Sequence, residues 1–105
     1  MEIIERGAGA PLVLVPGVQG RWEYLRPAVD ALADRFRVLT FSLAGERRSG
    51  RYDPARGFDG LADQVEAVLD SRGIASTIVC GVSFGGLVAL RFASNRASRT
   101  RALVL

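Results

Sequence analysis

The hydrophobic positions of this chain fall into five short runs, and the longer segments between the later runs have helical periodicity. Continuous runs of β-branched and apolar residues are typical of strands buried in a parallel sheet. The first run alternates only weakly and precedes a glycine-rich connector, which predicts a short edge strand. The five predicted strands cover residues 1–6, 12–15, 37–41, 77–80 and 101–105.

Three of the intervening segments, residues 24–35, 59–72 and 87–95, are predicted to be helices. Pro27 is tolerable only within the first turn of its helix, and Gly73 is placed to end the second helix. The alternation of strands and helices predicts an α/β fold, a mostly parallel sheet with helices on both faces. The apolar residues of the three helices are Leu25, Ala28, Val29 and Leu32, then Leu61, Val65, Val68 and Leu69, and then Leu87, Val88, Leu90 and Phe92.

Residues 76–95, STIVCGVSFGGLVALRFASN, join the fourth strand to the third helix through a serine flanked by glycines. The five residues around Ser83 fit G-x-S-x-G, the pattern of a nucleophile elbow, in which a strained turn lifts a serine hydroxyl above the sheet edge. Strand and helix approach closely at Gly81 and Gly85, where a Cβ would collide, and we expect Gly86 to add clearance. A merely structural glycine-rich turn is the alternative.

The composition fits one small domain, because 105 residues with 49% apolar content can form a packed core. No apolar run approaches the roughly 18 residues of a membrane span, and two glutamates stand near the start, where a signal peptide would be basic. We therefore expect a soluble, cytoplasmic protein. The single Cys80 lies in a predicted buried strand, which is typical of an inert core thiol and leaves no disulfide framework.

All 14 cationic side chains are arginine, and the net charge is +3. A chain without lysine cannot contain a P-loop, which needs its lysine. Arg91, Arg96, Arg99 and Arg101 cluster late in the sequence without interleaved aromatic residues. We therefore expect a solvated helix end and no nucleic-acid partner.

Two loops beside predicted strands are candidates for a functional role. The segment 42–58 is 17 residues long, a length that in a compact domain indicates either function or mobility. Trp22 and Tyr24 stand at the entrance of the first helix. We expect both to pack the loop at residues 16–21 against the sheet, with the rim of a substrate pocket as the alternative.

Three segments of the chain, LVLVPG, FSLAGERRS and GVSFGG, resemble parts of the α/β-hydrolase fold family. They are similar to its oxyanion strand and loop, its D-x-x-G-x-G-x-S loop and its nucleophile elbow, and the resemblance covers essentially the whole chain. In that family the elbow strand and the oxyanion strand are neighbours at the topological switch point of the sheet. Ligands bind beyond the carboxyl ends of such strands.

The resemblance implies roles for four residues. Ser83 would be the nucleophile that attacks a carbonyl carbon. The backbone N–H of Phe84 would be one oxyanion donor, which suits the free N–H groups at a helix N-terminus. The N–H of Val18 would be the other donor, with Gln19 as the alternative if the loop is shifted by one residue. The implied substrate is a small acyl compound, and no cofactor or metal is implied.

Several positions depart from the family pattern. Pro16 stands where the oxyanion loop often has histidine, Ser42 replaces the aspartate that opens the later loop, and Glu46-Arg47 replaces its H-G pair. The chain contains no histidine and cannot complete a Ser-His-Asp triad. The family places its acid and histidine after later strands, so we expect residues 1–105 to be the N-terminal portion of a single, longer α/β-hydrolase domain. We do not expect the missing acid among Asp53, Asp59 and Asp63. They fall in a loop and at a helix start, where N-capping explains acidic residues well.

These features predict that the complete protein is a serine hydrolase acting on an ester, thioester or amide through an acyl-Ser83 intermediate. An acyltransferase, a carbon–carbon bond hydrolase or a lyase on the same scaffold is the alternative. A non-catalytic binding protein is a third possibility, favoured by Pro16, Ser42 and the missing histidine. For these 105 residues alone we expect negligible turnover and marginal stability, because Ser83 lacks its base and the last strand has an unpaired apolar edge.

Overall fold

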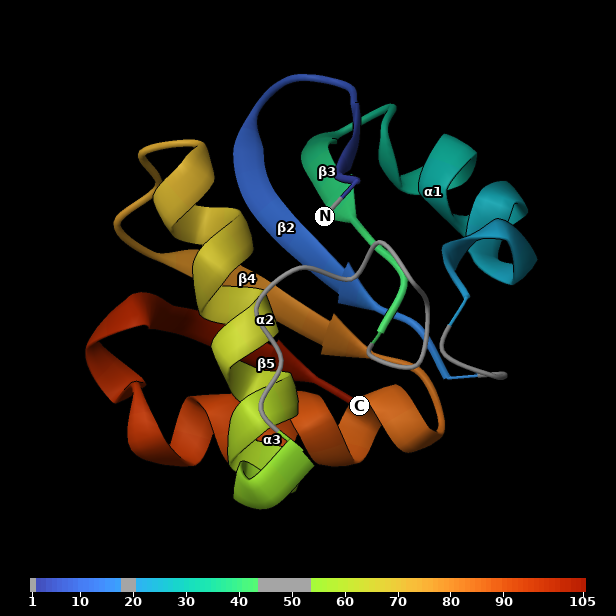
Figure 1. The fold of residues 1–105 in the computed structure, drawn as a ribbon. Helices are drawn as coiled ribbons and strands as arrows, with labels where there is room; N and C mark the ends of the chain where they lie inside the picture. The colour runs from blue at the N-terminus through green and yellow to red at the C-terminus, as the bar shows by residue number, and fades with distance from the viewer. Residues whose placement is uncertain (1, 18–20, 44–53) are drawn as a thin grey trace.

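A five-stranded sheet runs through the molecule (Figure 1). The structure is a computed structural model that describes residues 2–17, 21–43 and 54–105. The strands lie in the order β1-β3-β2-β4-β5; β1 is antiparallel to β3, and all other pairs are parallel. This arrangement confirms the mostly parallel sheet and the edge position of the first strand. The strands are β1 (Ile4–Arg6), β2 (Ala10–Val15), β3 (Phe36–Thr40), β4 (Thr77–Gly81) and β5 (Thr100–Val104).

Three α-helices connect the parallel strands, and they cover both faces of the sheet as predicted. They are α1 (Arg26–Leu32), α2 (Phe58–Ser71) and α3 (Phe84–Asn95). The step from β2 to β3 through α1 runs toward the β1 edge, whereas the steps through α2 and α3 run toward the β5 edge. Right-handed crossovers place helices of opposite step direction on opposite faces. Accordingly, α2 and α3 lie together, away from α1 (Figure 1).

The core has two layers because successive residues of a strand point to opposite sides of the sheet. Val13 is in register with Leu39 and Val79, and all three pack beneath α2 and α3. The neighbouring position Leu12 is in register with Val38, and both pack against α1. The continuous apolar sequence of the central strands therefore serves both faces, as a buried parallel sheet requires.

The first helix is shorter than the predicted span of 24–35. Residues Trp22–Leu25 form a 3-10 helix, and the α-helix begins only at Arg26. An α-helix starting at Tyr24 would put Pro27 at its fourth position, where a backbone N–H must donate the first intrahelical bond. Proline has no such N–H, so the α-helix starts later and Pro27 falls in its first turn. The predicted apolar stripe of this helix does pack against the sheet.

The second helix agrees closely with the prediction. It is shifted by one residue, and Val65, Val68 and Leu69 are fully buried beneath it, with Leu61 packed at the edge of the same cluster. Gly73 follows the helix with a φ of 65°, a left-handed conformation that ends helices and suits glycine. Among the helices of the described ranges, none is both long and apolar enough to cross a membrane.

Ion pairs connect α2 to the end of α3, and they correct two expectations from the sequence. Asp59 and Asp63 do not cap their helix; Asp59 accepts hydrogen bonds from Arg91 at 2.6 and 3.2 Å, and Asp63 pairs with Arg96 at 2.6 Å. Arg96 is only 15% exposed and also contacts Glu66 at 3.0 Å. These arginines are bound to carboxylates of α2 and do not simply extend into solvent.

Arg99 extends the same network beyond α3. It lies in the short 3-10 helix Ala97–Arg99 that leads into β5, and it contacts Glu66 at 3.4 Å and Asp70 at 2.8 Å. Its guanidinium also donates to the backbone carbonyls of Ile74 and Ala75, just before β4. One arginine therefore connects α2, the entrance of β4 and the entrance of β5.

A second, more exposed cluster lies near β1. Glu5 accepts hydrogen bonds from Arg37 at 2.9 Å and from Arg72 at 3.0 Å. The hydrogen bond from Arg37 is the main cause that lowers the pKa of the Glu5 carboxyl below its ordinary value. This cluster ties the antiparallel edge strand to β3 and to the end of α2.

Replacement of Arg96 by methionine should lower the free energy of unfolding by about 2 kcal/mol, between the values for exposed and buried ion pairs. Methionine keeps apolar contact with the Phe92 ring, which lies 5.4 Å from the Arg96 guanidinium carbon, but removes the charge that Asp63 and Glu66 share. Urea denaturation measures the difference. Arg72→Met is the matched control, because it removes one exposed pair and should cost less than about 1 kcal/mol. Equal losses for the two variants would contradict a special role for Arg96.

Candidate functional site

Ser83 occupies the turn between β4 and α3 in a conformation that serine rarely adopts. Its φ is 55° and its ψ is −119°, and among the described residues it is the only non-glycine with a positive φ. A residue held in such a region stores about 1–3 kcal/mol of strain and persists only where the surrounding structure imposes it. The serine is exposed, and its side chain forms no capping hydrogen bond to α3. The strained, exposed serine matches the predicted elbow.

The surroundings that impose this conformation are backbone contacts at glycines. A Cβ on Gly81 would overlap the backbone of Gly85 and Gly86, and a Cβ on Gly85 would overlap the carbonyl oxygens of Val15 and Pro16. The predicted close approach two residues before and after the serine is therefore confirmed. Gly86 differs from the expectation, because a Cβ there would have its nearest neighbour at 3.7 Å, an ordinary contact.

The end of β2 lies directly beside the serine. The N–H of Val82 donates to the carbonyl of Val15 at 3.1 Å, and a Cβ on Gly17 would lie 3.0 Å from the Cβ of Ser83. This neighbour relation of the two strand ends agrees with the predicted oxyanion arrangement. Val18 and Gln19, the candidate second donors, lie outside the described residues.

The N–H of Phe84 lies at the very start of α3, where N–H groups have no intrahelical acceptor. The next two N–H groups are used, because Gly85 donates to the Val82 carbonyl at 2.9 Å and Gly86 donates to the Ser83 carbonyl at 2.8 Å. The helix dipole favours negative charge at this end. The position therefore suits an oxygen that becomes negatively charged next to Ser83.

The side chains predicted to flank the site divide into two groups. Trp22 is buried, and its backbone N–H donates to the hydroxyl of Ser42, just after β3, at 3.4 Å, so it packs against the end of the sheet as expected. The Arg26 guanidinium lies over the Trp22 ring at 4.7 Å. Tyr24, in contrast, is 57% exposed and does not pack the loop against the sheet. Three further positions named from the sequence, Glu46, Arg47 and Asp53, lie outside the described residues.

The described residues near Ser83 do not supply a general base. The chain has no histidine, and Asp59 is bound to Arg91, whose hydrogen bond lowers the pKa of the Asp59 carboxyl. The same contact raises the pKa of Arg91, so the pair stays ionised. Within residues 2–17, 21–43 and 54–105, no three potential metal ligands gather in one place. Half-burial raises the pKa of the Cys80 thiol, which agrees with an unreactive core residue.

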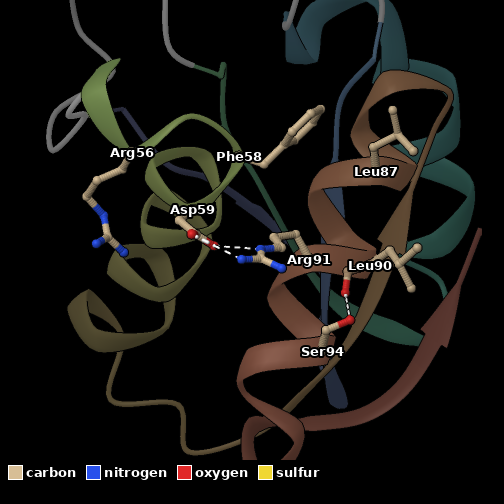
Figure 2. Close-up of a pocket in the computed structure, with 7 residues that line it drawn as sticks. All are labelled: Arg56, Phe58, Asp59, Leu87, Leu90, Arg91 and Ser94. Atoms are coloured by element: carbon tan, nitrogen blue, oxygen red, sulfur yellow. Dashed lines mark hydrogen bonds and ion pairs between the residues drawn. The ribbon is translucent and has the colours of Figure 1, made fainter.

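A groove between α2 and α3 was not predicted from the sequence. It has a volume of about 520 Å³, and Figure 2 shows Phe58 reaching from α2 toward α3 above the Asp59–Arg91 pair. The Phe58 ring also contacts the ring of Phe84, with centroids 5.4 Å apart. The groove is lined by Arg56, Phe58, Asp59, Leu87, Leu90, Arg91 and Ser94.

Helical geometry contained a signal for this groove. Val88 and Phe92 are one turn apart and fully buried against the sheet, whereas Leu87 and Leu90 are exposed on another face of α3. Four apolar residues at positions 87, 88, 90 and 92 cannot share one narrow stripe of a helix with 3.6 residues per turn. The helix therefore has a second apolar face, whose residues can be read from the sequence but whose place in the fold cannot.

Comparison with known proteins places these features in a family. A family model described as the alpha/beta hydrolase fold matches residues 10–105. RutD of Azorhizobium caulinodans, a candidate carbamate hydrolase, is 34% identical over 99 residues, which cover 94% of this chain and 37% of that protein. A soluble epoxide hydrolase of a Corynebacterium species is 35% identical over 95 residues, 89% of this chain and 32% of that protein. The chain thus spans about a third of the length of these relatives.

Solved structures show the same arrangement of strands and helices. A hydrolase from Pseudomonas aeruginosa superimposes with a TM-score of 0.83 at 25% identity, over 98% of this chain and 40% of that one. An enol-lactonase from Burkholderia xenovorans superimposes with a TM-score of 0.82 at 26% identity, over 97% of this chain and 41% of that one.

Gly85→Ala should destabilise the protein by about 3 kcal/mol or more, because the new methyl group overlaps the carbonyl oxygens of Val15 and Pro16 and the backbone must shift. Gly86→Ala is the matched control one residue later, where a Cβ makes only ordinary contacts. It should be neutral or stabilise by about 0.5–1 kcal/mol through helix propensity. Thermal unfolding of the two variants measures the contrast, and similar melting temperatures would argue against the tight contact between β2 and α3.

Ser83→Gly should be more stable than Ser83→Ala by about 1 kcal/mol, because glycine adopts a φ of 55° without strain whereas alanine keeps the strain of serine. Both variants remove the hydroxyl, so the comparison isolates the backbone. Denaturant unfolding of the two proteins provides the measurement. A Ser83→Gly protein that is less stable than Ser83→Ala would show that position 83 is not strained.

Proposed function

Because this chain belongs to the alpha/beta hydrolase fold family, we propose that the complete protein is a serine hydrolase with Ser83 as its nucleophile. The substrate is a small compound with an ester, thioester or amide carbonyl. The observation that carries the proposal is the positive φ of Ser83. A protein maintains such a strained backbone at a cost in free energy, and in a nucleophile elbow this turn exposes the serine hydroxyl above the sheet edge.

The reaction follows from the position of this hydroxyl. The Ser83 oxygen forms a bond to the carbonyl carbon while its proton passes to a base, and the carbonyl oxygen becomes an oxyanion. The N–H of Phe84 donates to this oxyanion, supported by its place at the start of α3, and the N–H of Val18 donates from the loop after β2. Collapse of the intermediate expels the leaving group and leaves acyl-Ser83, which water then hydrolyses.

The base is proposed to come from outside these 105 residues, because the chain has no histidine. We infer that residues 1–105 form the N-terminal portion of one longer domain that contributes the histidine and its acid. The chain spans 37% of the length of RutD and 32% of the epoxide hydrolase, which leaves room for those residues. The cytoplasm stays the expected compartment, and the half-buried, single Cys80 is compatible with it.

Acyl transfer is the second candidate function. A relative from Pseudomonas putida, the dihydrolipoyllysine-residue acetyltransferase component of an acetoin cleaving system, is 36% identical over 92% of this chain. The same acyl-Ser83 intermediate would then pass its acyl group to an alcohol, thiol or amine in place of water. Product analysis with an acceptor alcohol present separates the two reactions.

Ser83→Ala in the complete protein should abolish labelling by a fluorophosphonate probe and lower ester turnover by a factor on the order of 10⁴–10⁶. The reason is that the variant keeps the backbone of the turn but lacks the atom that bonds to the carbonyl carbon. Gel fluorescence and a p-nitrophenyl acetate assay measure the two effects.

Ser71→Ala is the control, since its hydroxyl donates to the Val68 carbonyl at the far end of α2 and has no contact with the elbow. This variant should label and turn over like the parent protein. Undiminished labelling of Ser83→Ala would remove the basis of the proposal.

A further inference from the structure

We propose that the groove between α2 and α3 binds the uncharged acyl chain of the substrate, so that the enzyme prefers medium-length acyl esters. This inference rests on the proposed role of Ser83 and deepens it. It assigns a chemical class to a surface that lies next to the elbow but takes no part in bond formation.

An apolar surface leads from the serine into the groove. Phe84 follows Ser83 directly, its ring contacts the ring of Phe58 at 5.4 Å, and Phe58 lines the groove. Further along α3, Leu87 and Leu90 lie about 6 and about 10 Å from Ser83 by the rise of the helix. A chain attached to the serine oxygen can therefore pass along the aromatic pair and reach both leucines.

The exposure of these side chains leaves them available to a ligand. Phe58 is 41% exposed, Phe84 42%, Leu87 55% and Leu90 45%. Four large apolar side chains in one place form a patch of the kind that marks a binding surface. Covering this patch with methylene groups removes apolar area from water, and that gain increases with each carbon of the chain.

The polar end of the groove favours an uncharged chain over an anionic one. Arg91 is already bound to Asp59 at 2.6 Å (Figure 2). Arg56 is bound to Asp63 at 2.7 Å. The cations are therefore neutralised by the protein itself. The Asp59–Arg91 pair also ends the apolar surface about two turns from the serine. Acyl carbons beyond that point therefore gain little apolar contact.

The test compares p-nitrophenyl acetate with p-nitrophenyl octanoate in the complete protein. The parent protein should show a higher kcat/KM for octanoate. Leu87→Trp and Leu90→Trp narrow the groove without touching the nucleophile or the oxyanion donors. Each should lower the octanoate-to-acetate ratio of kcat/KM by about tenfold, the effect of lost apolar contacts in a specificity pocket, while acetate turnover changes little. Ala31→Trp, at an exposed position of α1 on the opposite face of the sheet, is the control and should leave the ratio unchanged.

The outcomes separate this inference from the function it rests on. Turnover that depends on Ser83, combined with an unchanged ratio in both tryptophan variants, overturns the groove proposal and leaves the hydrolase proposal intact. The same unchanged ratio with a lowered melting temperature identifies the groove as a packing face for another part of the protein or for a second copy. Turnover of both esters that survives Ser83→Ala overturns both proposals.

Discussion

The close approach of three backbone segments determines the geometry of the elbow. The end of β2, the end of β4 and the start of α3 meet where Gly17, Gly81 and Gly85 leave no room for a Cβ. The hydrogen bond from Val82 to Val15 holds the two strand ends together on one side of the turn. Ser83 is the side chain at the centre of this contact, and its left-handed φ is the conformation that lets the chain pass from strand to helix within it.

The helix that follows the serine is held from two directions. Val88 and Phe92 pack α3 onto the sheet, and the arginines at its outer side and its end bind carboxylates of α2. Both kinds of contact lie within about four turns of the elbow. Because these contacts fix α3 against movement along and across the sheet, the first N–H groups of the helix keep a constant position relative to Ser83. A site that stabilises an oxyanion depends on such fixed donors.

Much of this architecture could be predicted from the sequence, because the deciding features are local. Apolar runs gave the strands, helical periodicity gave the core stripe of α2, and the two glycines around Ser83 gave the tight turn. What the sequence did not give depends on residues far apart in the chain. Asp59 and Arg91 are 32 residues apart, so their pairing could not be distinguished from helix capping before the helices were placed. The contact between Phe58 and Phe84 and the groove beside it arise in the same way. The two oxyanion assignments for the loop after Pro16 stay predictions.

The backbone conformation of Ser83 depends on the folding of the surrounding elements. The side chain of Ser83 makes no capping hydrogen bond to α3, and the close backbone contacts of the assembled strands and helix impose the φ of 55°. When these elements separate, the backbone at position 83 relaxes to an ordinary conformation, and the aligned N–H groups beside it are lost. The fraction of molecules with this backbone conformation at position 83 is therefore the fraction in which β2, β4 and α3 are docked. Among the described residues, the one non-glycine with a positive φ thus owes its backbone conformation to the docking of β2, β4 and α3.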